Sequence, residues 1–158
     1  MASIKRIDHV AIAVRDADQA TQQFVSLLNA VHIRTEILHE KAGDVKVSYL
    51  QIGENVLSLA QSLEADGFLN QHIAKHGEGL HHMGLEVDDL KQFIAEVEGK
   101  GFRIPVRDEF SNRSEVVLRP KDAAGVVLQI VEWKGGADVS VEDRMERIRQ
   151  LHNKPDKQ

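Results

Sequence analysis

The sequence has no cysteine, no long apolar run and no block of basic residues. Without cysteine the chain can form no disulfide, no cysteine-based zinc site and no thiol nucleophile, so any catalysis has to rest on histidine, carboxylates, lysine or a metal ion. No run approaches the roughly 18 apolar residues of a membrane-spanning helix. A net charge of −5, with both signs interspersed, disfavours nucleic acid as a partner.

The 158 residues are enough for one ordinary domain, or for two half-sized modules that share a core. The first residues, Met1 to Arg6, run directly into an alternating pattern and lack the apolar segment of a signal peptide. We therefore expect a cytoplasmic protein without a membrane partner.

Hydrophobic periodicity predicts the same order of elements twice: a strand, a helix and three further strands. In the first half of the chain the predicted elements are a strand at 7–14, a helix at 17–28 and strands at 34–39, 45–52 and 55–61. A helical linker is predicted at 62–76. In the second half they are a strand at 80–87, a helix at 90–100 and strands at 102–107, 114–119 and 125–132.

The repeat is also visible residue by residue. Superposing His9 on His82, an offset of 73 positions, also places Asp16 on Asp89, each just before a predicted helix. The closing strands 56–60 and 127–131 match at an offset of 71. One module is therefore predicted to be present twice.

Alternation along the strands indicates which side chains share a face. His9 shares its face with two alanines, and His82 shares its face with Gly84, so both histidines stand among small residues that leave room for a ligand. By the same argument Ser58 and Gln129 occupy matching places in the closing strands, and a pseudo-twofold would bring all four together. A strand histidine can equally be a hydrogen-bonded packing residue, and Ser58 and Gln129 can be solvated.

Three segments resemble the vicinal oxygen chelate superfamily of glyoxalase, bleomycin resistance and dioxygenase proteins, and within it most closely the methylmalonyl-CoA epimerases. They are IDHVAIAV (7–14), HGEGLHHMGLEVDDL (76–90) and LRPKDAAGVVLQIVEW (118–133). The resemblance implies an α+β fold in which two βαβββ modules, 4–62 and 78–133, form a cupped mixed sheet within one domain, 4–133. A C-terminal helix at 139–152 follows, and it can dock on its own domain or on a second subunit.

The resemblance also implies a divalent metal ion, such as Co, Mn, Ni, Zn or Fe. Carried over position by position, its ligands are His9, His82, Gln129 and Ser58. The epimerases have Glu at the Gln129 position and Gln or Glu at the Ser58 position, so this chain offers four neutral donors. Because no carboxylate attracts the cation, we expect weaker metal binding.

The activity implied is proton transfer at the α-carbon of a small acyl-CoA through a metal-stabilised enolate, and the family commonly forms homodimers. Epimerisation needs a base on each face of the carbon. Gln129 stands where relatives have a Glu base, but an amide cannot accept the proton. Lys46 can serve as one base if desolvation lowers its pKa, or it is an exposed strand lysine.

Two other functions stay open. The first is a small-molecule-binding protein without catalysis, as among the antibiotic-resistance members of the superfamily, and the missing carboxylate favours it. The second is a lactoylglutathione lyase or a dioxygenase-like enzyme, which the superfamily permits.

Overall fold

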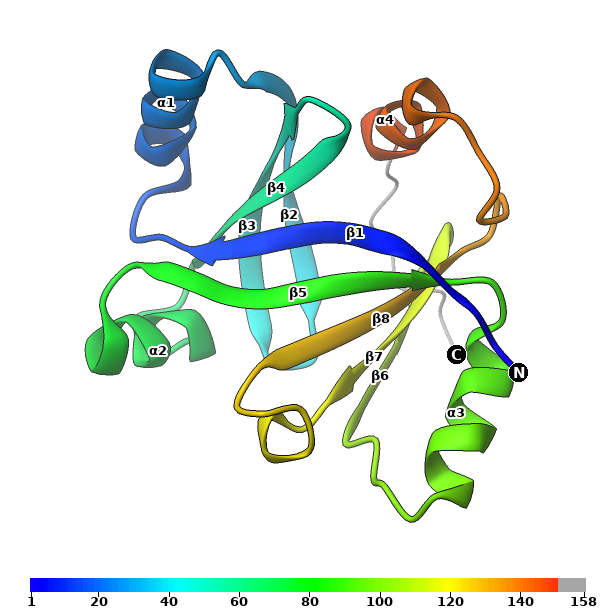
Figure 1. Cartoon of the computed structure of the whole chain (residues 1–158). Coiled ribbons are helices and arrows are strands. Elements are labelled where there is room, and N and C mark those ends of the chain that lie inside the picture. Colours follow the sequence, from blue (N-terminus) through cyan, green and yellow to red (C-terminus); the bar gives the residue numbers. More distant parts are fainter. Residues whose placement is uncertain (151–158) are drawn as a thin grey trace. The chain divides into compact units, whose positions relative to one another are not determined.

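The computed structural model describes residues 1–150. Within them the chain forms eight strands, four α-helices and one 3-10 helix, an α+β fold in which the βαβββ order occurs twice, as predicted (Figure 1). The elements are β1 (Ile4–Ala13), α1 (Ala17–Leu28), β2 (Val31–Glu40), β3 (Gly43–Ile52), β4 (Asn55–Ser62), α2 (Phe68–His76), β5 (Gly79–Val87), α3 (Leu90–Gly99), β6 (Val106–Glu109), β7 (Arg113–Leu118), η1 (Pro120–Asp122), β8 (Val127–Trp133) and α4 (Val141–Arg149).

The chain divides into two compact units. One comprises Met1–His9 with His82–Val139, and the other comprises Val10–His81 with the C-terminal helix α4. Both β1 and β5 pass from one unit into the other, because the unit boundaries fall inside these strands. The assignment of 4–133 to one domain built from modules 4–62 and 78–133 stays a prediction.

The unit of Val10–His81 has the strand order β2-β3-β4-β1. Helix α1 packs on one face of these strands, where its alanines meet Leu50, Leu57 and Leu59. The other face carries Ser58 of β4. Its neighbours in the register are Tyr49 on β3 and Ala11 on β1. Apolar residues on alternate positions therefore fill the helix-covered face.

The unit of His82–Val139 has the strand order β1-β5-β8-β7-β6. Its core joins Leu90 of α3 to Val116 and Ile130 of the sheet, with Val87 and Ile104 completing the cluster. This is the helix-covered face of the second repeat.

The two repeats agree in register and in helix capping. The first strand of each repeat runs parallel to the last, with Val10 opposite Leu57 in one and Met83 opposite Leu128 in the other. Asp16 and Asp89 are the N-caps of α1 and α3, and each carboxylate accepts at least one backbone N–H of the first turn. The predicted duplication is confirmed at these positions.

Two predicted starts differ from the structure by four residues or more. The linker helix begins at Phe68 and not at residue 62, because Ser62 still belongs to β4 and its hydroxyl accepts the N–H of Leu69. The strand predicted at 102–107 begins only at Val106. Pro105, which has no N–H for a sheet ladder, lies in the irregular segment before it.

Helix α4 docks on its own chain, within the unit of Val10–His81. The Arg144 guanidinium donates to the carbonyl of Glu54, and Arg34 of β2 donates to the carbonyl of Arg149. Met145 and Ile148 are buried. Ser140 caps the helix through the N–H of Asp143, so the helix begins at Val141 and not at residue 139. Residues 151 and 152 of the predicted helix lie outside the described residues. None of the helices in the described part of the chain is long and apolar enough to cross a membrane.

Candidate functional site

His9 and His82 meet in the unit that contains His82–Val139. Their Nε2 atoms are 3.2 Å apart, and their rings stand almost perpendicular, at 88°. Gly84 makes this possible, because a Cβ atom at that position would lie 2.3 Å from Cε1 of His9. The two histidines that the repeat singles out are therefore neighbours, with one nitrogen of each ring directed at the other.

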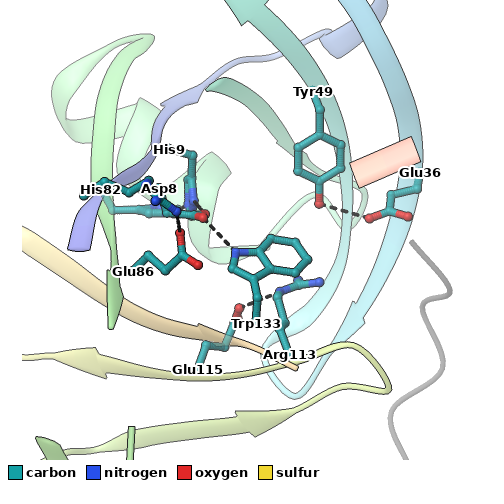
Figure 2. Close-up of polar contacts among 10 residues, drawn as sticks. Asp8, His9, Glu36, Tyr49, His82, Glu86, Arg113, Glu115 and Trp133 are labelled. Atoms are coloured by element: carbon teal, nitrogen blue, oxygen red, sulfur yellow. Dashed lines mark hydrogen bonds and ion pairs between the residues drawn. The ribbon is translucent and has the colours of Figure 1, made fainter. Parts of the chain in front are cut away.

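Asp8 holds the other side of the His9 ring. Its Oδ2 lies 2.7 Å from Nδ1 of His9, and its Oδ1 accepts the indole N–H of Trp133 at 2.7 Å (Figure 2). Strand alternation predicts that Asp8 and His9 lie on opposite faces, yet their side chains bond directly. Neither Asp8 nor Trp133 is among the residues that sequence analysis selected. The sequence signal that could have indicated Asp8 is its position directly before His9, which places a carboxylate next to an imidazole.

Gln129 lies on the same face of the sheet as His82. The register pairs it with Gly84 of β5 on one side and with Val117 of β7 on the other. Because the His9 ring fills the space above Gly84, Gln129 and the two imidazoles share one face of this unit. Three of the four predicted ligands are thus on the same surface.

Two further carboxylates on this face are paired with arginines. Glu86 is fully buried and pairs with Arg6 at 2.6 Å, and Glu115 is buried against Arg113 at 3.0 Å. In residues 1–150 no group of three or more His, Asp or Glu side chains is arranged to hold a metal ion. Glu86 and Glu115 are thus both engaged in ion pairs on the face that carries the two histidines.

Ser58 and Lys46 belong to the unit of Val10–His81, and Ser58 as the fourth ligand stays a prediction. Ser58 is buried at the centre of its sheet. Lys46 is on the opposite face, where it pairs with Gln61 and its ammonium lies 2.5 Å from Asp18 of α1. This ion pair gives Lys46 a structural role, and its role as a base stays a prediction.

A buried carboxylate that sequence analysis missed lies on the Ser58 face of that unit. Glu36 pairs with Val47 in the register and accepts the phenol hydroxyl of Tyr49 at 3.0 Å. Its second oxygen lies 3.3 Å from Arg34. The sequence signal that could have indicated Glu36 is its position two residues before Leu38, which is also buried and lies on the same face of the strand.

His81, the neighbour of His82 in sequence, lies in the unit of Val10–His81 and faces α2. Its ring is 4.8 Å from that of His72 and 5.9 Å from that of Phe68. Burial, together with the nearby His72 imidazole, lowers the pKa of His81 from 6.5 to about 4. His81 is thus predominantly neutral at physiological pH.

The His9–His82 geometry fits two ligands of one cation. Two nitrogens bound to the same ion at about 2.0–2.1 Å stand roughly 2.9 to 3.4 Å apart in octahedral or tetrahedral geometry, and the observed separation is 3.2 Å. The Asp8 carboxylate behind His9 is the partner that metal-binding imidazoles usually have. Their donor chemistry, nitrogen with a neutral oxygen from Gln129, suits a first-row transition metal better than Mg²⁺ or Ca²⁺.

Two βαβββ repeats, with one histidine from the leading strand of each, define a protein of the paired βαβββ class. The chain belongs to the glyoxalase/bleomycin resistance protein/dioxygenase superfamily, whose family model matches residues 8–116.

Several of the similar proteins are methylmalonyl-CoA epimerases. Human mitochondrial methylmalonyl-CoA epimerase is 28% identical over 135 residues, which cover 81% of this chain and 74% of that protein. The uncharacterized protein YqjC of Bacillus subtilis is 25% identical over 137 residues, covering 84% and 95%. A Streptomyces coelicolor methylmalonyl-CoA epimerase variant with bound 2-nitronate-propionyl-CoA has a TM-score of 0.76 at 26% identity, covering 84% and 99%.

Proposed function

We propose that this protein is a metal-dependent isomerase that transfers a proton at the α-carbon of a small acyl-CoA, with methylmalonyl-CoA as the substrate to test first. The observation that carries the proposal is the convergence of the His9 and His82 Nε2 atoms at 3.2 Å. The similarity to several methylmalonyl-CoA epimerases, whose solved structures include complexes with acyl-CoA compounds, supports the substrate class.

His9, His82 and Gln129 would hold the cation, with Ser58 as the fourth ligand that the family resemblance implies. When bound, a divalent cation acts as a Lewis acid that stabilises the enolate formed when the α-proton leaves a thioester. Co, Mn, Ni, Zn and Fe are the candidate ions.

The chain's own groups supply the rest of the chemistry. Asp8 orients His9, and Gly84 leaves space for the ring. Proton removal and return need basic groups on the two faces of the α-carbon. Gln129 can orient a water or an oxygen of the substrate but cannot accept the proton, so water, Lys46 or a carboxylate has to act as base.

The test is incubation with methylmalonyl-CoA in deuterated water, with each of the five metals in turn. We expect one deuteron to enter the α-position, as measured by mass spectrometry. The matched control is the His9→Ala, His82→Ala double variant, in which exchange should fall to the uncatalysed rate. Absence of exchange by the wild-type chain with every metal would contradict the proposal.

A second candidate is a small-molecule-binding protein without catalysis. It is favoured by the neutral donor set at the histidine pair, since Glu86 and Glu115 are both engaged by arginines. Elemental analysis of protein purified without chelator separates the two. Stoichiometric metal that is lost in the His9→Ala, His82→Ala double variant rules out a metal-free binding protein.

A further inference from the structure

Asp8 divides its two carboxylate oxygens between two donors that are far apart in sequence. Trp133, at the end of β8, donates its indole N–H to Oδ1 at 2.7 Å, and Oδ2 lies 2.7 Å from Nδ1 of His9. Asp8 is only 9% exposed, so little water competes for either oxygen. An indole N–H can only donate, which makes Oδ1 the acceptor and leaves Oδ2 for the imidazole.

The indole is itself held in place. The Arg113 guanidinium carbon lies 5.6 Å from the centre of the Trp133 ring and 4.3 Å from the centre of the Phe110 ring. Glu115 anchors Arg113 through a buried ion pair at 3.0 Å. Because these side chains are buried, the direction of the indole N–H is set by packing on β7 and β8.

We propose that Trp133 and Asp8 are positioning residues for His9: they hold its Nδ1 in the protonated form and direct the Nε2 lone pair toward His82 and a shared cation. This inference rests on the proposed function for the identity of the cation. The positioning itself is a property of the metal-free chain.

The tautomer follows from the acceptor. A carboxylate oxygen has no proton to give, so the 2.7 Å contact to Nδ1 requires the proton to be on the imidazole. A neutral ring that is protonated at Nδ1 has its lone pair on Nε2, the atom 3.2 Å from His82. Asp8 therefore prepares His9 to bind a cation through Nε2. Its negative charge behind the ring also makes the imidazole a stronger electron-pair donor, a contribution that the neutral amide of Gln129 does not make.

Two variants test the positioning. In Asp8→Asn an amide N–H can face Nδ1, which favours the tautomer protonated at Nε2 and removes the lone pair from the site. In Trp133→Phe the aromatic packing beside Arg113 is largely kept, but the N–H that fixes Oδ1 is lost. Ser48→Ala is the matched control, because it removes a buried hydrogen bond, to Thr21, that involves neither histidine.

The first measurement is the tautomer of His9 in the metal-free chain, from 15N NMR at pH 8. We expect protonated Nδ1 in the wild type and in Ser48→Ala, protonated Nε2 in Asp8→Asn, and a mixture in Trp133→Phe. A wild-type ring protonated at Nε2, or a tautomer unchanged in both Asp8→Asn and Trp133→Phe, overturns the proposal. Thermal unfolding of each variant establishes that it is folded at the temperature used.

The second measurement is the dissociation constant for Co²⁺. Removing the partner of a metal-binding histidine weakens metal affinity by about 10- to 100-fold, which we expect for Asp8→Asn, with a smaller loss for Trp133→Phe. Equal affinity of both variants and the wild type overturns the proposal. Failure of the proposed function has a different signature: the wild-type chain exchanges no α-proton, while the His9 tautomer still responds to both substitutions.

Discussion

The Nε2 atoms of His9 and His82 lie 3.2 Å apart, although the two residues are 73 positions apart in the chain. Each histidine comes from the leading strand of one repeat, and both lie in one compact unit. The contact depends on a residue with no side chain, Gly84, beneath the His9 ring.

Gly84→Ala tests the steric requirement of this pair. The new Cβ would lie 2.3 Å from Cε1 of His9, so the ring has to leave the position in which it meets His82. We expect Co²⁺ affinity to fall by about tenfold or more, which corresponds to about 1.4 kcal/mol, and overpacking to cost about 1–3 kcal/mol of unfolding free energy. Gly135→Ala is the control, since nothing lies within 4 Å of its added Cβ. An unchanged Co²⁺ affinity in Gly84→Ala would contradict the model of the site.

Gln129→Glu tests whether the neutral donor set limits metal binding. The new carboxylate shares the face of His82 and would add an ionic attraction to the cation. We expect Co²⁺ to bind at least about tenfold more tightly, measured by titration calorimetry. Gln92→Glu makes the same charge change on the exposed surface of α3 and should leave the affinity unaltered. Equal affinities of Gln129→Glu and wild type would show that residue 129 does not reach the ion.

Glu115→Ala tests the buried ion pair that anchors the arginine beside Trp133. Without Glu115 the buried Arg113 charge loses its carboxylate, which is expected to lower the free energy of unfolding by about 3–5 kcal/mol. Glu98→Ala breaks the exposed ion pair with Arg107 and should cost less than about 1 kcal/mol. Urea denaturation compares the two variants. Similar losses in both would be evidence against a strongly buried pair.

The lowered pKa of His81 predicts that the free energy of unfolding depends on pH. Its pKa is lowered to about 4 in the folded chain, by burial first and by His72 second, against 6.5 in the unfolded chain. Between these values the unfolded chain binds more protons, so the free energy of unfolding rises with pH from about 4 to 6.5, and stability is lost as the pH falls through that window. His81→Gln should reduce the slope. An NMR titration with a pKa near 6.5 for this ring would contradict the expectation.

Much of the fold could be predicted because its signals are local. Alternation and helical spacing located the strands and helices of both repeats, and Asp16 and Asp89 marked the starts of α1 and α3. The two largest errors, at Phe68 and Val106, occur where a turn or a proline interrupts an apolar segment. Local periodicity cannot locate such interruptions.

The candidate site was predicted only in part. His9 and His82 could be predicted because they occupy matching positions in the two repeats. The register of β8 places Gln129 on the sheet face that carries both histidines. Lys46 was a candidate base, but its side chain pairs with Asp18 on the helix-covered face. Ser58 stays a prediction, since it belongs to the other unit.

The sequence by itself determined the duplication, the order of elements and the pair of histidines, because each depends on spacing along one chain. The tertiary structure decided which groups surround that pair. Trp133 reaches Asp8 across 125 positions, and arginines neutralise Glu86 and Glu115. Such contacts arise when strands far apart in sequence are packed together, and burial gives these polar groups few other partners than one another. No local pattern specifies which ones meet.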